Sequence, residues 1–430
     1  MNAATGLVAS VLIARGLGPG RLGEYALITS VAGIAALFSD LGIGGTAIRF
    51  TAWARKGGDV EGQLAVLRWA FRLRVAMVLA VSAAAFALTP LLADRAWHAP
   101  HLTPLMRTSL LIGICGALAS IPLLYFQSQQ DFRANARVAI AQSSLSFSAV
   151  VAIAVLDAWS LWALVLASVG AAVITAVAVQ FLVPRRTIFV RGEFSSLRRS
   201  GLAWLGAVLR PPALVRPSGQ DLDAGPLGGF AIHMVASSAI QLLVLRVDVW
   251  LMGALISADE IGLYSVATKF TLPLAMLVGA VHTALLPRAS SIRRIEELRA
   301  MLARTIRLTA LASVACLAYA IIAPLLAPRI FGAPYAPATF LAQVLCLRFC
   351  AALLSCPASV AGNSLGLVRV YWVISALQLA AVLALNLLLL PRIGVLAAPI
   401  SLLIQDVLGA VLVWALVWRR LRPDAEVTPA

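Results

Sequence analysis

The chain has 430 residues, of which 61% are hydrophobic and only 12% are charged, and its mean hydropathy is +0.94. Soluble domains are about half apolar and about one quarter charged, so this composition excludes a soluble enzyme, a secreted disulfide scaffold and a disordered tail. The formal net charge of +16 comes from 34 Lys and Arg residues against 18 Asp and Glu residues. Because the apolar residues occur in runs of about twenty, the length that crosses a bilayer, the sequence predicts a polytopic membrane protein.

Apolar segments bounded by Arg, Gly and Pro follow one another along the chain, with no sizeable soluble domain between them. Their helical period predicts an all-α bundle, since a helix satisfies its backbone hydrogen bonds inside the bilayer. About twelve spans are predicted: residues 3–14, 25–48, 75–93, 105–126, 138–156, 159–183, 227–256, 261–286, 308–328, 338–361, 370–390 and 393–418. The first would cover only roughly 18 Å of a hydrocarbon core about 30 Å thick, so we expect its true start to lie upstream.

Basic residues are distributed unequally over the connecting segments. With the N-terminus placed inside, 25 of the 34 basic residues fall in cytoplasmic segments, six fall in outer segments and three remain within spans. Cytoplasmic loops carry the excess of positive charge, so we expect an inner (plasma) membrane protein with both termini in the cytoplasm. The net charge then reflects orientation and contact with membrane lipids, and nucleic acid is not an expected partner.

The two halves of the sequence match each other at an offset of 234–239 residues. The matching segments are Leu22–Tyr25 with Ile261–Tyr264, Arg72 with Arg307, Pro90–Ala93 with Pro324–Ala327, and Ser120–Pro122 with Ser355–Pro357. Six helices per half carry both halves into the membrane in the same direction, so we predict two parallel six-helix bundles. The predicted domains are an N-terminal bundle (1–184), a cytoplasmic linker (185–226), a C-terminal bundle (227–418) and a cytoplasmic tail (419–430).

Several short motifs resemble those of bacterial polysaccharide flippases of the O-antigen and capsule type, over roughly residues 3–420. They are Arg15–Pro19, Leu22–Tyr25 and Ser39–Gly44 in the first half, and Arg246–Asp248, Gly262–Ser265 and Phe331–Tyr335 in the second. The resemblance implies the multidrug-extruder-like fold of the multidrug/oligosaccharidyl-lipid/polysaccharide exporter superfamily. It also implies a transporter, without a cofactor, that flips an undecaprenyl-diphosphate-linked oligosaccharide from the cytoplasmic to the outer leaflet by alternating access. The polysaccharide polymerase and glycosyltransferases of the same pathway are expected partners. The short first helix and an insertion at 198–228 depart from the family pattern.

Six charged residues lie deep within the predicted spans, well away from their ends: Arg246, Lys269, Arg348, Asp40, Asp248 and Asp406. A charge at the centre of a membrane helix costs about 2.5–3.5 kcal/mol on insertion scales, so such residues face protein or water and commonly serve function. We expect Arg246 and Arg348, with Lys269, to hold the diphosphate, because the planar guanidinium fork donates several hydrogen bonds to phosphate at once. The alternative is that these cations pair with Asp248, Asp406 or backbone carbonyls.

The acidic residues predict either ion coupling or structural ion pairs. Asp248 and Lys269 each lie about eight residues from the outer end of their spans, hence roughly 12 Å deep, and an ion pair between them is geometrically reasonable. Asp40 is a candidate titrating or cation-coupling group, or a cap at a helix break before Gly42. In the first outer loop, Arg15 and Arg21 either guide a headgroup or are solvated loop charges.

The remaining features separate the competing classes of function. Residues 290–307 predict an amphipathic helix on the inner leaflet, and Gln378, Asn386 and Gln405 predict contacts to sugar hydroxyls or between helices. His98 and His101 lack a third ligand, so no metal site is expected. A small-molecule extruder of the same fold stays open, since the embedded charges comprise three basic and three acidic residues. An enzyme is not expected, because the longest outer segment, 94–104, has no acid cluster.

Overall fold

The described part of the chain is helical throughout. The computed structural model describes residues 2–40, 43–44, 47, 50–51, 54, 58–129, 131–182, 240, 243, 246–292, 295–365 and 368–421. Within these ranges there are helices and turns but no strand. The predicted linker at 185–226, the insertion at 198–228 and the tail beyond Leu421 lie outside the described residues. The all-α expectation is confirmed for the described ranges.

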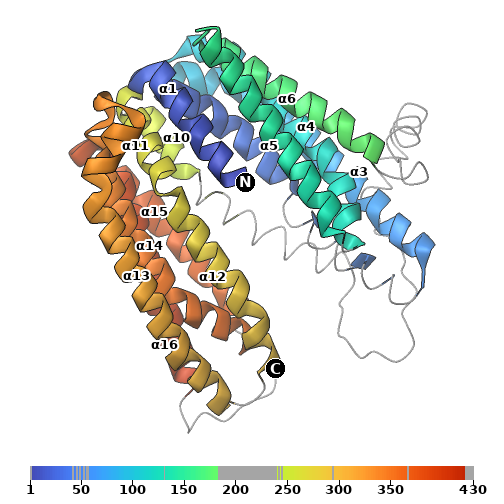
Figure 1. Ribbon diagram of the computed structural model, residues 1–430, viewed down its shortest axis with the longest axis vertical. Coiled ribbons are helices and arrows are strands. Elements are labelled where there is room, and N and C mark those ends of the chain that lie inside the picture. The colour runs from blue at the N-terminus through green and yellow to red at the C-terminus, as the bar shows by residue number, and fades with distance from the viewer. Residues whose placement is uncertain are drawn as a thin grey trace. The chain divides into compact units, whose positions relative to one another are not determined.

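The chain divides into two compact units (Figure 1). Unit 1 comprises Met1–Leu12 and Leu27–Leu242, and unit 2 comprises Ile13–Ala26 and Leu243–Ala430. The helices of unit 1 are parts of α1 (Asn2–Asp40), then α3 (Val60–Pro90), η1 (Leu91–Ala96), η2 (Pro100–Leu102), α4 (Thr103–Ser128), α5 (Phe132–Val155) and α6 (Leu161–Leu182). Those of unit 2 are α10 (Val247–Leu255), α11 (Ala258–Phe270), α12 (Leu272–Ser291), α13 (Ile295–Phe331), η4 (Ala333–Tyr335), α14 (Ala338–Ser364), α15 (Val368–Ile393), η5 (Gly394–Leu396) and α16 (Ala397–Arg420). The second unit therefore takes in a segment, Ile13–Ala26, that the sequence assigns to the N-terminal bundle.

The helices are long and apolar enough for a multi-pass membrane protein. Seven helical stretches of the described residues meet the length and composition of a span, or eight if α11 and α12, which meet at a 45° bend, form one broken span. One of the seven, Val373–Arg420, contains most of α15 and all of α16. The predicted spans at 370–390 and 393–418 are thus two helices joined by the short η5 turn.

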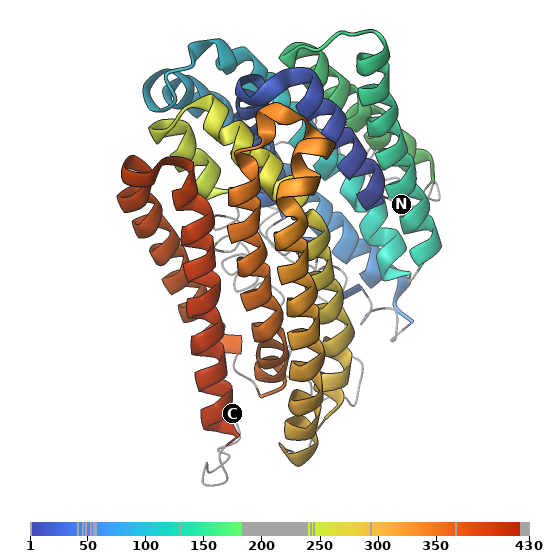
Figure 2. The same ribbon diagram turned by 60° about the vertical axis from the view of Figure 1, so that its left-hand side comes forward.

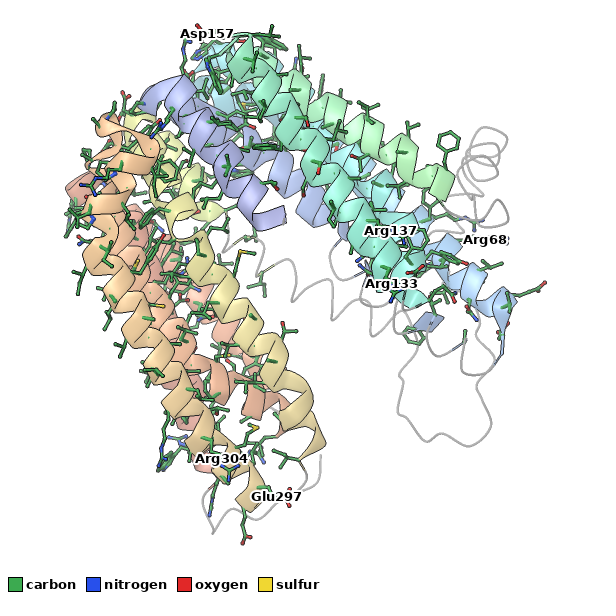
Figure 3. The ribbon with its side chains drawn as sticks, in the orientation of Figure 1. Arg68, Arg133, Arg137, Asp157, Glu297 and Arg304 are labelled. Atoms are coloured by element: carbon green, nitrogen blue, oxygen red, sulfur yellow. The ribbon has the colours of Figure 1, made fainter. Side chains whose placement is uncertain are left out.

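Three arginines of unit 1 lie at the same end of its helices. Arg68, Arg133 and Arg137, which the sequence places on one side of the membrane, gather at one end of the unit, and Asp157 lies at the opposite end (Figure 3). Asp131 begins α5 by accepting a hydrogen bond from Ala134 N at 3.0 Å, as an N-cap residue does. The three arginines that the sequence assigns to one side of the membrane thus lie at one end of this unit.

A left-handed glycine divides α1 into two helices. Gly18 has φ 73° and ψ 172°, a conformation that residues with a Cβ rarely adopt. Pro19 follows at the first turn of the second helix, where its missing N–H removes no hydrogen bond. The break separates the predicted spans at 3–14 and 25–48. Residues 13–26 around this break form what we call the outer strap, because the sequence places residues 15–24 outside the membrane.

The outer strap crosses α11 at two glycines that are equivalent in the two repeats. A Cβ added to Gly23 would lie 1.8 Å from the carbonyl oxygen of Ala258, and one added to Gly262 would lie 2.0 Å from the carbonyl oxygen of Pro19. Pro19 and Ala258 are 239 residues apart, as are Gly23 and Gly262, which is the offset of the local sequence repeat. Each helix therefore offers its glycine to the backbone of the other, and backbone approaches this close are possible only without side chains.

The long helix α13 corrects one prediction. It runs unbroken over 37 residues from Ile295 to Phe331, so residues 295–307 are its first turns and not a separate helix on the inner leaflet. The reason is that Leu298 and Leu302, four residues apart, are buried against residues of α14, α15 and α16, and the helical period continues past them. Figure 2 shows these orange and red helices running side by side.

One face of α13 has the length and composition to cross a membrane. Between Arg307 and Arg329 lie 22 residue steps, or about 33 Å of helix, which matches the thickness of a hydrocarbon core. Large apolar side chains are exposed along this stretch: Leu308, Leu311, Val314, Ile321 and Leu325. Glu297 and Arg304 lie beyond it at the charged end of the helix (Figure 3).

Candidate functional site

Charged side chains from four helices come together inside unit 2. Arg348 of α14 donates from Nε to Oδ2 of Asp406 of α16, and the two atoms are 2.6 Å apart. Both side chains retain some exposure, 23% for Arg348 and 16% for Asp406. Arg348 stands ten residues beyond the start of α14, about 15 Å along the helix, so this ion pair lies deep within the span.

Asp248 of α10 forms the second part of the cluster. Its carboxylate is only 5% exposed and accepts hydrogen bonds from the Tyr264 hydroxyl on α11 and from Val249 N, the latter at 2.8 Å. Arg348 and Arg246 both interact electrostatically with Asp248. The two parts of the cluster are therefore within reach of each other, and a buried carboxylate with two donors on it is a stable arrangement.

Lys269 completes the cluster but does not have the predicted partner. It lies in the last turn of α11, is exposed, and interacts electrostatically with Arg246. Among the described residues, the hydrogen-bond partners of Asp248 are Tyr264 and Val249, so the expected Asp248–Lys269 ion pair is not formed. Depth alone gave that expectation; Tyr264 and Lys269 are five residues apart on α11 and point in different directions around it.

The five ionisable groups of this cluster, Arg246, Asp248, Lys269, Arg348 and Asp406, carry one net positive charge. Tyr264 is the residue that sequence reasoning missed, although it lies in the Gly262–Ser265 motif quoted for the family resemblance. Its hydroxyl donates a hydrogen bond to Asp248, whose carboxylate also interacts electrostatically with Arg246 and Arg348. The cluster can therefore attract an anion at a depth where apolar surroundings strengthen electrostatic interactions.

Arg15, a candidate for guiding a headgroup, contacts the end of α13. Its Nε donates to Ile330 O at 2.8 Å and its Nη2 donates to Arg329 O at 2.6 Å. The last carbonyls of a helix have no partner within it and attract cations, so Arg15 caps the end of α13. Arg21 lies on the same outer strap and is exposed.

The outer strap makes a further polar contact with the rest of unit 2. Tyr335 is fully buried, and its hydroxyl donates to Ala14 O at 2.7 Å. Burial raises the pKa of Tyr335 well above that of an ordinary tyrosine, so the hydroxyl keeps its proton. Glu260 of α11 accepts from Val395 N at 3.4 Å and closes a capping box with Ser257. The loops that the sequence places outside thus meet at one end of unit 2.

The other predicted residues make no hydrogen bond with this charged cluster among the described residues. Asp40 is the last residue of α1, and its side chain lies outside the described part of the structure. Gln378 of α15 donates to Gln405 O of α16 at 3.2 Å. Of the two predicted roles, this is a hydrogen bond between helices and not a contact to a sugar hydroxyl. Asn386 Oδ1, Ser401 Oγ and Gln405 Oε1 are buried on these two helices without a partner among described residues. A metal-binding group of three or more His, Cys, Asp or Glu residues is not found in the described ranges.

The comparisons with known proteins agree with the predicted class. Two family models, both described as polysaccharide biosynthesis protein, match residues 1–203 and 197–339. Together they cover more than three quarters of the chain. No curated protein matches the chain.

Solved transporters share the fold at low sequence identity. An inward-facing multidrug resistance MATE family transporter of the MOP superfamily is 14% identical, with a TM-score of 0.71 over 98% of this chain and 94% of that one. The lipid II flippase MurJ in an inward closed conformation is 11% identical, with a TM-score of 0.71 over 97% and 86%. A MOP superfamily transporter from Pyrococcus furiosus, described by the reverse polarity of its binding pocket, is 15% identical, with a TM-score of 0.57 over 97% and 91%.

Proposed function

We propose a cargo and a direction of transport for this multi-pass membrane protein, whose sequence matches two family models described as polysaccharide biosynthesis protein and whose fold is that of solved MOP-superfamily transporters. The cargo is an undecaprenyl-diphosphate-linked oligosaccharide, moved from the cytoplasmic to the outer leaflet of the plasma membrane by alternating access. The protein acts as a transporter and not as an enzyme, with both termini in the cytoplasm. The pathway polymerase and glycosyltransferases are its proposed partners.

The observation that carries this proposal is the cationic cluster of unit 2. Arg348 lies about 15 Å inside the span. A charged arginine at that depth is energetically unfavourable in a membrane, and such residues commonly bind a substrate or an ion. The diphosphate of a lipid carrier must pass this depth during flipping, and arginine is suited to bind it through two parallel N–H···O bonds. Arg246 and Lys269 add positive charge around the same position.

The engagement of both acids weighs against the second candidate, an extruder of cationic small molecules. Such a cargo requires carboxylates that are available to it. Here Asp248 accepts from Tyr264 and Val249, and Asp406 accepts from Arg348. An anionic cargo therefore fits the cluster better than a cationic one.

The test is a translocation assay in proteoliposomes of purified full-length protein. A fluorescent polyprenyl-diphosphate oligosaccharide and a cationic dye are followed in parallel. We expect movement of the lipid without energised dye efflux. Dye efflux without lipid movement would reject the proposed cargo in favour of the extruder.

Charge reversal at the cluster gives the matched test. Arg246→Glu and Arg348→Glu should each lower the rate of lipid translocation at least about tenfold, the effect of roughly 1.4 kcal/mol. The control is Arg392→Glu, an exposed arginine at the end of α15, which should transport like the wild type. Normal transport by both cluster variants at normal abundance would show that the cluster does not hold the cargo.

A further inference from the structure

Asp406 holds Arg348 by one edge only. The contact joins Oδ2 of Asp406 to Nε of Arg348 at 2.6 Å. A guanidinium carries five N–H donors, one on Nε and four on the two Nη atoms. Among the described residues, no hydrogen bond involves either Nη atom. The end of the guanidinium fork, which matches two phosphate oxygens, is therefore not taken by the carboxylate.

The other acid of the cluster does not take this end either. Both oxygens of Asp248 already accept hydrogen bonds, Oδ2 from Tyr264 and Oδ1 from Val249 N. Its effect on Arg348 is electrostatic at a distance. The charge of Arg348 is thus balanced, which lowers the cost of keeping it in the membrane, while its four Nη donors have no bond to the described chain.

The helices that carry the pair are packed firmly together. Trp414 of α16 donates from Nε1 to Leu354 O of α14 at 3.0 Å, two turns beyond the ion pair. Val413 and Val417 are buried against Ala358 and Ala361 of α14. A site is accurate when it is built on rigid elements and its side chains are held by neighbours, and α14 with α16 provides both conditions.

We propose that Asp406 is a positioning residue for the diphosphate: by binding Nε it fixes the plane of the Arg348 guanidinium and directs the two Nη atoms toward two phosphate oxygens. This rests on the proposed function, since it names the residue that prepares the same site. Asp406 then aids binding through Arg348 and does not compete with the ligand. Without the charge of Asp406 the guanidinium of Arg348 can rotate, so its two Nη atoms point at the phosphate oxygens for a smaller fraction of the time.

The test measures binding of undecaprenyl diphosphate to the full-length protein in nanodiscs. Arg348→Ala and Arg348→Lys should both weaken binding more than tenfold, because a lysine ammonium is a point charge without a fork. Asp406→Asn should weaken binding about tenfold, the lower end of the loss seen when a residue that orients a metal-binding side chain is removed. In the Arg348→Ala background, Asp406→Asn should change affinity less than about twofold, because it acts only through Arg348.

Each outcome decides the inference. Tighter binding by Asp406→Asn would show that Asp406 competes with the ligand, and a further loss in the Arg348→Ala background would show a separate structural role; either overturns positioning. If Asp406→Asn does not fold, Asp406→Glu keeps the charge and should bind between wild type and Arg348→Ala, whereas wild-type affinity overturns the inference. A wild-type protein that fails to bind undecaprenyl diphosphate rejects the proposed function as well, so the two failures are distinguishable.

Discussion

Replacing either glycine at the crossing of the outer strap with α11 should separate the two helices. A Cβ would lie 1.8 Å from Ala258 O in Gly23→Ala and 2.0 Å from Pro19 O in Gly262→Ala, whereas a Cβ needs at least 3.0 Å. The obstacle is a backbone carbonyl in both cases, which no side-chain rotation removes. Each substitution therefore requires the crossing to open by about 1 Å.

The expected cost follows from two opposing effects. Overpacking costs up to about 3 kcal/mol, and the higher helix propensity of alanine returns about 1 kcal/mol, so each variant should lose about 2 kcal/mol of stability. The same separation relieves both contacts. The double variant should therefore lose no more than one single variant, well below the sum of about 4 kcal/mol.

The assay is thermal unfolding of the purified protein in detergent. For a unit of this size 1 kcal/mol corresponds to about 2–4 °C, so each single variant should melt about 4–8 °C below wild type. Gly279→Ala on α12 is the matched control, since its added Cβ would meet no atom within 4 Å. If Gly23→Ala and Gly262→Ala melt like this control, or if the double variant shows the full sum, the inferred close crossing is refuted.

Three further substitutions test the contacts around the outer strap. Arg15→Gln removes the cation at the end of α13 and should cost about 1 kcal/mol, measured by the same melting assay, whereas an unchanged melting temperature would mean that Arg15 does not cap the helix. Tyr335→Phe leaves Ala14 O without its donor and should cost about 1–2 kcal/mol. The folded protein keeps the Tyr335 pKa above its unfolded value, which is near 10. The stability that the Tyr335 hydroxyl contributes should therefore fall in the wild type only above about pH 10, whereas the Phe variant has no such hydroxyl and should show no such fall. Parallel pH–stability curves of the two proteins would contradict this. Ser257→Ala removes the N-cap of α11 and should cost about 1 kcal/mol, with Ser265→Ala in the same helix as the control; equal melting of the two would show that the capping box does not contribute.

The sequence predicts the helices well because they depend on local patterns. Apolar runs locate α4, α5, α6 and α14 to within several residues, and the break in α1 falls between the predicted spans at 3–14 and 25–48. The repeat offset of 239 anticipates that Gly23 and Gly262 are equivalent. The close approach of each glycine to the other helix is not predictable, because it depends on how two distant segments cross.

The predictions that did not match the structure concern direction around a helix and continuity along it. Depth along the span placed Asp248 level with Lys269, but Tyr264 is the residue of α11 that points at the acid. Arginines at 299, 304 and 307 suggested a surface helix, although Leu298 and Leu302 bury the opposite face of the same continuous α13. For Arg348, the sequence left a diphosphate and an ion pair as alternatives; the bond through Nε shows that Asp406 and a further anion can use different edges of one guanidinium.

The apolar length of α13 also has a consequence for the membrane in which the protein works. The apolar stretch of α13 between its flanking arginines is about 33 Å long. In a thinner bilayer this stretch would be too long, and the helix would have to tilt to keep it within the hydrocarbon core. Leu298 and Leu302 anchor the start of α13 to α16, the helix that carries Asp406. Short-chain lipids that tilt α13 would therefore strain the packing that holds the ion pair, so transport should depend on acyl-chain length.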